Sequence, residues 1–531
     1  MKALSILYGG RLAAEALSCA NGESAVSMAL TAASQFFGVQ KSVFLGVDGQ
    51  SYELPPNVEI VCRPTWTKKD LFRELSRLGS GFDLVYVAWA DCPLLDPELA
   101  KSMAERHLRY AAEYTYADGL PYGFAPEILA PATAGILAKM IDAQTFADDP
   151  SVDRDAIFSV IQKDINSFDI ETEISTVDLR HYRLSFSADS KRNAMLLSRF
   201  SNAGCKSASD AETFITQHPE MMRTLPAFFA IQVSAVCPQS CSYCPWTKYA
   251  PSSGTNKLDN FMAKATFEKL LDNIQEFSGD AVIDLSLWGE LSLHPQKMEL
   301  IEMVLDRPAL SLVIETSGIG WTSEQLKDLA LMARKSALRK NHHAPLSWII
   351  SLDAHDPERY KELRGSGFAE AHACAKTLLE LFPCDAYVQA VRMKGFEDDI
   401  EHFYRSWKDN NIPDAARKTE RKDGRHIIIQ KYNDFSGALP KMQASDLSPV
   451  KRRQCWHIQR DINILLDGTV PSCKEDIGAL AGKADRPILG NACNEDLSLI
   501  WERGNALYRE HCNNHYKGIC AQCDEYYTYN F

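Results

Sequence analysis

The chain has 531 residues, of which 45% are hydrophobic and 24% charged, and its 57 basic and 70 acidic residues give a net charge of −13. This length predicts about three domains of ordinary globular composition, and the negative charge disfavours a general nucleic-acid binder. No apolar run approaches the roughly 20 residues that span a bilayer, and the start has no signal peptide, so we expect a cytoplasmic protein with reduced thiols.

The first part of the chain alternates short apolar runs with amphipathic helical patterns. Strands are predicted at residues 3–9, 42–49 and 83–91, and helices at 25–37 and 69–79. Such alternation is typical of an open α/β sheet. We therefore expect a Rossmann-like domain over residues 1–203, followed by a polar linker over residues 204–224.

A second alternating series follows, in which helical patterns separate six apolar strand patterns. The strands are predicted at residues 228–236, 280–288, 310–317, 346–353, 385–393 and 425–432. Six βα units in succession favour a parallel sheet that curls toward a barrel. We expect a partial (β/α)6 barrel of the TIM type over residues 225–440, and a small C-terminal domain with six cysteines over residues 441–531.

Three cysteines follow the first strand of the second series within eight residues, where chance would place about 0.2. They are Cys237, Cys241 and Cys244, in a polar loop that disfavours a buried group of inert thiols. A structural zinc site needs four ligands, and no further Cys or His lies between Ile231 and Pro251, so zinc requires a distant ligand. An iron–sulfur cluster on three thiolates leaves one iron open for a substrate or cofactor.

The C-x3-C-x-aromatic-C spacing after a first barrel strand resembles the radical S-adenosylmethionine (SAM) superfamily. The resemblance implies a 4Fe–4S cluster whose open iron binds SAM. It also implies SAM contacts at successive strand ends, namely Tyr243 with the adenine, Gly289 and Glu290 with the ammonium, Thr316 and Ser317 near the cofactor, Ser351 and Asp353 with the ribose, and Arg364 with the carboxylate. Trp288 and Leu291 depart from the family's Gly-Gly-Glu-Pro, whereas Glu290 keeps its acidic position.

The chemistry that the resemblance implies is homolytic. One electron from the reduced cluster cleaves SAM, and the resulting 5′-deoxyadenosyl radical abstracts a hydrogen atom from the substrate. An external donor such as flavodoxin or ferredoxin is expected to supply the electron. The positions of the polar residues agree independently, because each falls at or after the carboxyl end of a predicted strand, where barrels of this type build their sites.

A second set of cysteines lies in the predicted C-terminal domain. Cys455 and Cys473 flank an Asp-Gly turn at Gly468, and Cys520 and Cys523 form a C-x2-C. The turn predicts a hairpin that brings Cys455 toward Cys473. This pattern resembles the SPASM/twitch extension of radical SAM enzymes, which implies one auxiliary 4Fe–4S cluster closed by the four cysteines and suited to electron transfer.

Alternatives remain for this set. Position 529 is Tyr where the full SPASM pattern has another Cys, so a second auxiliary cluster is not expected. Zinc on the same four thiolates stays open, because four cysteines suit either metal. Cys493 and Cys512 are either structural or alternative ligands.

The first domain resembles the cytidylyltransferase-like family that activates sugars, through residues 86–129 and 178–200. The resemblance implies a metal-binding role for Asp91, against which stands a helix-capping role. Gly9, Gly10 and Arg11 are expected to approach a phosphate through backbone N–H groups. However, Glu15 stands at the position of the family's catalytic lysine, so we expect a degenerate domain that binds rather than transfers a nucleotide.

Three functions remain to be separated. The first is a radical SAM oxidoreductase acting on an unidentified carbohydrate-like molecule, or a radical SAM enzyme that matures a peptide or protein. The second is CTP-dependent sugar nucleotidyl transfer in the first domain. The third is an iron–sulfur electron carrier, against which the predicted SAM residues argue. Two basic clusters, at residues 417–425 and 451–453, are expected to be solvated surface or a site for an anionic partner.

Overall fold

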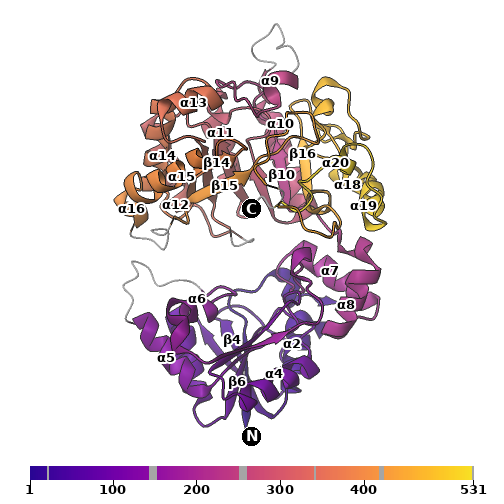
Figure 1. Cartoon of the computed structure of the whole chain (residues 1–531). Helices are drawn as coiled ribbons and strands as arrows, with labels where there is room; N and C mark the ends of the chain where they lie inside the picture. The colour runs from indigo at the N-terminus through magenta and orange to yellow at the C-terminus, as the bar shows by residue number, and fades with distance from the viewer. Residues whose placement is uncertain are drawn as a thin grey trace. The chain divides into compact units, whose positions relative to one another are not determined.

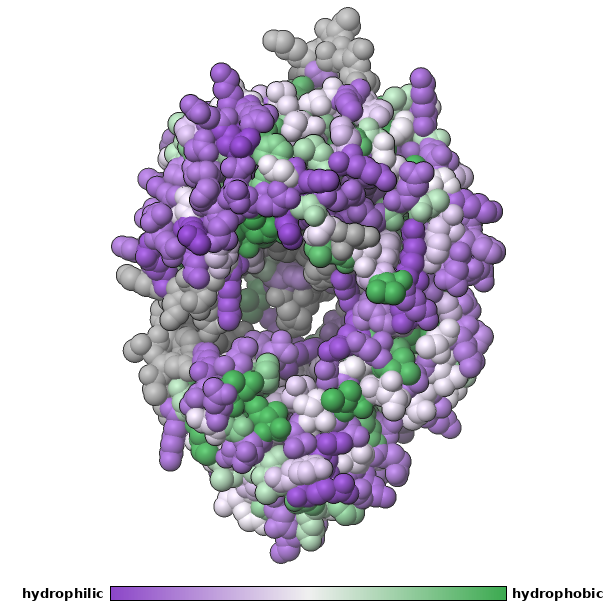
Figure 2. Space-filling model, in the orientation of Figure 1, coloured by the Kyte–Doolittle hydropathy of each residue, from purple (hydrophilic) through white to green (hydrophobic). Residues whose placement is uncertain are grey.

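The computed structural model describes residues 1–20, 23–142, 152–249, 260–339, 343–417, 424–445 and 447–528. The chain divides into two compact units, Met1–Thr224 and Leu225–Phe531 (Figure 1). On the face in Figure 2, hydrophilic residues predominate and hydrophobic residues form small separate patches. Within the described ranges, no helix combines the length and the hydropathy that a membrane span requires.

Unit 1 is built on a seven-stranded sheet in the order β5-β4-β1-β6-β8-β7-β9. The strands are β1 Ala3–Tyr8, β4 Val39–Val47, β5 Val58–Arg63, β6 Leu84–Trp89, β7 Tyr114–Asp118, β8 Glu127–Leu129 and β9 Ile170–Ile174. The three predicted strands are confirmed as β1, β4 and β6, which pair in parallel, whereas β8 is antiparallel to both neighbours. All six residues of β1 are buried, as expected for a central strand covered on both faces.

Helices flank this sheet, and several begin at a side-chain cap. Thr67 and Asp70 form a capping box at the start of α3, and Asp96 caps α4 ahead of Pro97. The helices are α1 Ala14–Leu17, α2 Ala25–Ser34, α3 Lys68–Gly79, α4 Pro97–Arg109, α5 Pro131–Asp142, α6 Phe158–Ile161, α7 Lys191–Asn202 and α8 Ala208–Gln217. The strands β2 Cys19–Ala20 and β3 Glu23–Ser24 form a small antiparallel pair.

The segment expected to be a linker, residues 204–224, is part of unit 1. It contains α8, whose Ala211 and Ile215 are fully buried in the core of the unit. The backbone N–H of Ala208 donates to Asp96 at 3.0 Å. The linker prediction is therefore wrong, because an apolar stripe at helical spacing lies within a largely polar sequence.

Unit 2 is built on a seven-stranded, all-parallel sheet in the order β15-β14-β13-β12-β11-β10-β16. The strands are β10 Phe228–Ile231, β11 Ala281–Asp284, β12 Leu310–Thr316, β13 Leu346–Ser351, β14 Ala386–Arg392, β15 Ile427–Lys431 and β16 Asp461–Ile464. The six predicted strands are confirmed, and the seventh, β16, comes from the segment assigned to a separate C-terminal domain. The sheet therefore has seven strands rather than six.

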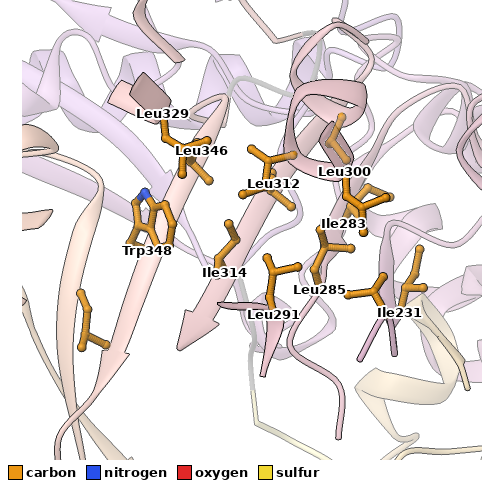
Figure 3. Packing of buried hydrophobic residues seen from close by; sticks show 14 of the residues in the cluster. Ile231, Ile283, Leu285, Leu291, Leu300, Leu312, Ile314, Leu329, Leu346 and Trp348 are labelled. Atoms are coloured by element: carbon orange, nitrogen blue, oxygen red, sulfur yellow. The ribbon is translucent and has the colours of Figure 1, made fainter. Parts of the chain in front are cut away.

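The two faces of this sheet differ in chemistry because side chains alternate along a strand. Leu312 and Ile314 of β12 belong to the main hydrophobic core with Ile283 and Trp348, as Figure 3 shows. Val313, between Leu312 and Ile314, and Glu315, which follows Ile314, lie on the opposite face. The apolar face packs against the helices, and the other face is left for a site.

Helices connect the strands of unit 2. Thr322 and Gln325 form a capping box at the start of α12, and Asp356 caps α13. The helices between the strands are α9 Trp246–Tyr249, α10 Lys264–Ser278, α11 Lys297–Leu305, α12 Ser323–Lys335, α13 Pro357–Arg364, α14 Phe368–Leu381, α15 Glu397–Arg405 and α16 Asp414–Arg417. Two of the predicted helices, over residues 264–277 and 368–382, are confirmed as α10 and α14.

The last part of the chain adds short elements to unit 2. They are β17 Thr469–Val470, β18 Gly490–Asn491, α17 Trp456–Arg460, α18 Leu497–Arg503, α19 Asn505–Cys512 and α20 Ile519–Gln522. The predicted turn at Gly468 forms, with the N–H of Leu465 donating to Thr469 O at 2.8 Å. However, β17 pairs with β18, while β16 pairs with β10, so the two sides of the turn belong to different sheets.

The place of β16 in the core yields a first prediction. Ile464 is fully buried, so Ile464→Ala should lower the free energy of unfolding by about 2–4 kcal/mol through lost burial and a cavity. Urea unfolding, with hydrogen exchange of peptides from β10 and β16, measures this loss. The control Ile488→Ala removes the same atoms from a residue that is 42% exposed, and should cost less than about 0.5 kcal/mol. Equal losses in both variants would contradict the buried position of β16.

Candidate functional site

Unit 2 contains a cavity of about 610 Å³ at the carboxyl ends of its strands. Residues from all seven strands line it, so the sheet curves around the cavity from one edge strand to the other. One lining residue from each strand, in sheet order, is Gln430, Gln389, Ser351, Glu315, Asp284, Ala230 and Asn463. This face of the sheet, which carries both polar and apolar side chains, therefore lines one cavity.

The predicted three-cysteine loop lies at this cavity, and all three cysteines line it. Cys237 is exposed, Cys244 is half-buried and Cys241 is buried. Burial, together with the neighbouring Cys241 thiol, raises the pKa of Cys244 to about 11. The loop is held by the end of α13, because the N–H groups of Ser240 and Ser242 donate to Arg364 O and Leu363 O at 3.2 and 3.0 Å.

Gly289 brings the loop after β11 against the backbone that leads to the first cysteine. A Cβ at this position would lie 1.7 Å from the carbonyl oxygen of Ser234, so only glycine fits. The preceding Trp288 has a φ of 50°, and the N–H of Glu290 donates to Val236 O at 2.8 Å. The contact holds Glu290 beside the start of the cysteine loop.

Glu290 is 3% exposed and lines the cavity with a carboxylate fixed by its neighbours. Its Oε1 accepts from Thr316 Oγ1 at 2.7 Å and from Ser292 N at 3.3 Å. Its Oε2 accepts from Ser317 N at 2.8 Å. The structure thus brings three predicted site residues, Glu290, Thr316 and Ser317, into one hydrogen-bonded group.

Arg364, Asp353 and Tyr243 form a buried network under the cysteine loop. Arg364 Nη1 donates to Asp353 Oδ2 and, at 2.6 Å, to Tyr243 OH, which also donates to Asp353. Arg364 Nε donates to Gln239 Oε1 at 2.9 Å, and Val391 N donates to Asp353 Oδ1 at 2.7 Å. The Asp353 side chain is fully buried and does not line the cavity, whereas Arg364 and Tyr243 do.

Two acidic residues in the cavity were not singled out from the sequence. Glu315 Oε1 accepts from the predicted site residue Ser351 at 2.7 Å and from Gln389 Nε2 at 2.7 Å. Asp284 ends β11 and accepts from Ser286 N at 2.9 Å. Both are isolated acids in otherwise apolar strands. Because side chains alternate between the two faces of a strand, each carboxylate lies on the face away from the hydrophobic core.

The second cysteine set gathers in the C-terminal part of unit 2. Cys455, Cys473 and Cys520 are buried and Cys523 is half-buried. Burial raises the pKa of Cys473, and the thiols of Cys455 and Cys523 raise it further. Burial, together with the neighbouring Cys520 thiol, raises the pKa of Cys455 to about 12. The four predicted ligands are therefore close neighbours in the structure.

Charged groups connect this cysteine set to the cavity wall. Lys431 lines the cavity and pairs with Asp524 at 2.8 Å and with Glu525, next to Cys523 in sequence. Asn433 lines the cavity too, and its Nδ2 donates to both oxygens of Glu475 at 3.1 and 3.0 Å. Hydrogen-bonded side chains thus lead from the cavity to the segments that carry the cysteines.

The two spare cysteines have neighbours of different kinds. A Cβ at Gly468, where φ is 85°, would lie 2.5 Å from Cys493 Sγ, so Cys493 packs on the turn glycine. Cys512 packs at the edge of the small hydrophobic cluster that contains Cys455 and Cys520.

Unit 1 differs from its predicted nucleotide site. The N–H groups of Gly9 and Gly10 both donate to Leu45 O, at 2.7 and 3.2 Å. The expectation that they approach a phosphate is wrong, because the donors are already bonded inside the sheet. The helix-capping role of Asp91 is also wrong, since Asp96 caps α4.

The basic clusters are only in part as expected. Residues 418–423 of the first cluster lie outside the described residues. In the second, the guanidinium of Arg452 lies over the rings of Tyr516 and Tyr526, 4.0 and 4.7 Å from their centroids, and donates to Cys520 O at 2.6 Å. Arg452 is therefore a structural residue of the C-terminal part rather than solvated surface.

No family model matches the chain. An uncharacterized protein of Treponema pallidum (strain Nichols) is 36% identical over 384 residues, which cover 71% of this chain and 98% of that protein. A second uncharacterized protein of the same strain is 36% identical over 67 residues, 13% of this chain and 31% of that protein.

Solved structures give weaker similarities. BtrN in complex with AdoMet and 2-DOIA is 14% identical with a TM-score of 0.35, over 56% of this chain and 92% of BtrN. A cytidylyltransferase from Leptospira borgpetersenii is 14% identical with a TM-score of 0.34, over 41% of this chain and 95% of that one. Streptococcus suis SuiB bound to the precursor peptide SuiA is 13% identical with a TM-score of 0.38, over 76% and 78% of the two chains. Scores this low do not establish a common fold.

The Arg364 network yields a second prediction. Arg364→Met should lower the free energy of unfolding by about 3–5 kcal/mol, because it leaves the fully buried Asp353 carboxylate without its cation. Urea unfolding of the full chain measures the loss. The control Arg359→Met, on the same helix, breaks a pair with Asp399 whose arginine is 31% exposed, and should cost less than about 1 kcal/mol. If the two variants lost the same amount, the buried pair would not organise the loop.

Asp284 yields a third prediction, on pH. Burial and the charge of Glu315 together raise its pKa to about 6, although hydrogen bonds from Ser286 and the charge of Lys474 oppose them. The folded chain then keeps a proton that the unfolded chain releases near pH 4, so stability falls as pH rises from about 4 to about 6. Asp284→Asn should therefore be more stable than the wild type by about 1–3 kcal/mol above pH 6, and equal to it near pH 4.

Urea unfolding over this pH range checks the Asp284 prediction. The control Asp328→Asn changes an exposed aspartate on α12 and should leave the pH dependence as it is in the wild type. A difference between Asp284→Asn and the wild type that does not change with pH would refute the buried, proton-holding state of Asp284.

Proposed function

We propose that this chain, which belongs to the same protein family as the uncharacterized Treponema pallidum protein, is a radical SAM enzyme. The observation that carries the proposal is the shared cavity, because three cysteines of one loop and the buried Glu290 line one space at the carboxyl ends of parallel strands. Three thiolates leave a metal position open. The volume of about 610 Å³ suits a cofactor together with part of a substrate.

Cys237, Cys241 and Cys244 would hold a 4Fe–4S cluster, with one iron left for SAM. When bound, the reduced cluster and SAM supply a 5′-deoxyadenosyl radical that abstracts hydrogen from an unactivated C–H bond. The graded exposure of the three thiols supports this role, because the buried Cys241 anchors the loop while Cys237 is open.

Glu290 and Gly289 would receive the ammonium group of SAM. A carboxylate has about four lone-pair positions, and described donors occupy three of them on Glu290. One position, on Oε2, is left for a further donor. Thr316 and Ser317 thereby orient the carboxylate before the ammonium arrives.

Arg364 would bind the SAM carboxylate. Its Nε and Nη1 donate to Gln239, Tyr243 and Asp353, it also hydrogen-bonds the Tyr360 side chain, and it lines the cavity. Asp353 would act as a positioning residue through Arg364 and Tyr243. Contacts with the ribose would then fall to Ser351, with Glu315 behind it, and the ring of Tyr243 would meet the adenine.

The four C-terminal cysteines would hold one auxiliary 4Fe–4S cluster. Four thiolates suit either zinc or an iron–sulfur cluster, and the resemblance to the SPASM/twitch extension favours the cluster. Four thiolates leave no open iron, so this set suits electron transfer during net oxidation of a substrate.

The cavity would take a polar substrate. Asp284 and Glu315 supply acceptors and Lys431 and Lys474 supply donors, so the space suits a polar molecule that has groups of both kinds. A carbohydrate-like molecule or a peptide fits this description. We expect an external electron donor such as flavodoxin or ferredoxin and a cytoplasmic location. Nucleotidyl transfer in unit 1 receives no support from Gly9 and Gly10, whose N–H groups are bonded to Leu45.

Iron content and SAM cleavage test the proposal together. After anaerobic reconstitution the wild type should hold about eight irons and, once reduced with dithionite, release 5′-deoxyadenosine from SAM. Replacing Cys237, Cys241 and Cys244 with Ala should remove about half of the iron and all of the cleavage. Replacing Cys520 and Cys523 with Ala should lower the iron content and leave cleavage in place.

The matched control is Cys374→Ala, which removes a buried thiol of α14 outside both sets and should change neither reading. SAM cleavage that survives Cys237→Ala would overturn the radical SAM assignment. Zinc in place of iron at the C-terminal set, after reconstitution with both metals, would overturn the auxiliary cluster alone.

A further inference from the structure

Arg154 lies at the centre of a charged cluster in unit 1 that the proposed radical reaction does not use. Its Nη2 donates to Asp91 Oδ2 at 2.7 Å and to Asp189 Oδ2 at 2.8 Å. Its Nη1 donates to Asp91 Oδ1 at 3.2 Å and to Tyr122 OH at 3.0 Å. One guanidinium thus bridges two carboxylates from distant parts of the chain.

The surroundings fix this guanidinium in place. It lies over the rings of Trp89 and Tyr122, 4.7 and 4.6 Å from their centroids. The side chain of Asp91 is 6% exposed, that of Asp189 21% and that of Arg154 24%. Asn193 Nδ2 donates to Asp189 Oδ1 at 2.8 Å, so the second carboxylate is held from its other side.

Without Arg154 these two carboxylates would form a cation site. They belong to the ends of two segments, just after β6 and just before α7, and an oxygen of each lies within 3 Å of the same nitrogen atom. Mg²⁺ is commonly bound by one or two carboxylates with water completing the shell. The sequence resemblance of unit 1 implies such a metal at Asp91. The described residues do not fit it, because the Arg154 guanidinium fills the place between the carboxylates.

We infer that Arg154 stands in for a divalent cation at Asp91 and Asp189. The guanidinium keeps its charge at every physiological pH and presents a fixed fork of donors that matches two carboxylates. Unit 1 therefore folds with an internal counter-ion and needs no metal at this place. The same arrangement makes Asp91 and Asp189 a latent cation site, which opens when Arg154 is removed.

Mn²⁺ binding by the full chain tests this inference, with Mn²⁺ as a spectroscopic substitute for Mg²⁺. In EPR titrations, Arg154→Ala should bind about one more Mn²⁺ per chain than the wild type. Adding Asp91→Asn to Arg154→Ala should abolish the extra site. Arg154→Lys keeps a cation between the carboxylates and should gain none. Mg²⁺ should raise the Tm of unit 1 in Arg154→Ala and leave that of the wild type unchanged.

The matched control is Arg180→Ala. Arg180 also pairs with two aspartates, Asp118 at 2.9 Å and Asp178 at 2.8 Å, but it is 59% exposed. This variant should gain no Mn²⁺ site. If Arg154→Ala fails to fold without metal, Arg154→Gln takes its place, and refolding of Arg154→Ala by Mg²⁺ would itself support the inference. Wild-type Mn²⁺ binding that Asp91→Asn removes would overturn it, as would no gain in both Arg154→Ala and Arg154→Gln.

Discussion

The buried ion pair between Arg364 and Asp353 is the interaction on which the arrangement of the cavity depends. Asp353 has no exposed side-chain surface, so its charge is tolerated only with a cation in contact. Through the remaining donors of Arg364, the pair also fixes Gln239 and Tyr243. Both residues belong to the three-cysteine loop, and a polar loop of this kind has few apolar contacts of its own. The loop therefore takes its shape from the end of α13 rather than from its own sequence.

Curvature of the sheet is the second requirement. Lining residues come from all seven strands, including the edge strands β15 and β16, so the polar side chains at the strand ends face one another. The strand β16 closes one side of the site by pairing with β10 over more than 200 positions of sequence. It also places the C-terminal cysteine set in the same unit as the cavity. Because of this placement, Lys431 and Asn433 in the cavity wall bond to Asp524 and Glu475, which belong to the segments that carry the C-terminal cysteines.

Local patterns predicted a large part of this fold, and their failures have identifiable causes. Six strands of unit 2 were evident because each is a short apolar run between helical patterns. The strand β16 was missed because the Asp-Gly turn at Gly468 indicated a local hairpin, whereas the pairing partner lies far away in sequence. The segment of α8 was interpreted as a helix-biased linker because its apolar stripe, with Ala211 and Ile215, is narrow.

The site was predicted unevenly for similar reasons. The cysteines and Glu290 were singled out because their spacing and their place at strand ends are visible in the sequence, and Glu290 lines the cavity with the three-cysteine loop. Glu315 and Asp284 are single acids in apolar strands. Whether such a residue belongs to a site depends on which face of the sheet borders the cavity, and local sequence patterns do not show this. The phosphate role of Gly9 and Gly10 failed because the direction of a backbone N–H is decided by the neighbouring strand, here through Leu45.

The clustered charged groups of the two units differ in whether their hydrogen-bonding capacity is used up within the fold. In unit 2, the Glu290 carboxylate accepts three hydrogen bonds from described residues and keeps one lone-pair position beside the cavity that it lines. In unit 1, Arg154 already donates to Asp91 and Asp189 and is stacked between two rings. Groups that keep unsatisfied capacity beside an enclosed space can bind a ligand, whereas groups that satisfy one another stabilise the fold. On this criterion we expect the proposed chemistry of the chain to take place in unit 2, whereas Arg154 and its two carboxylates stabilise the fold of unit 1.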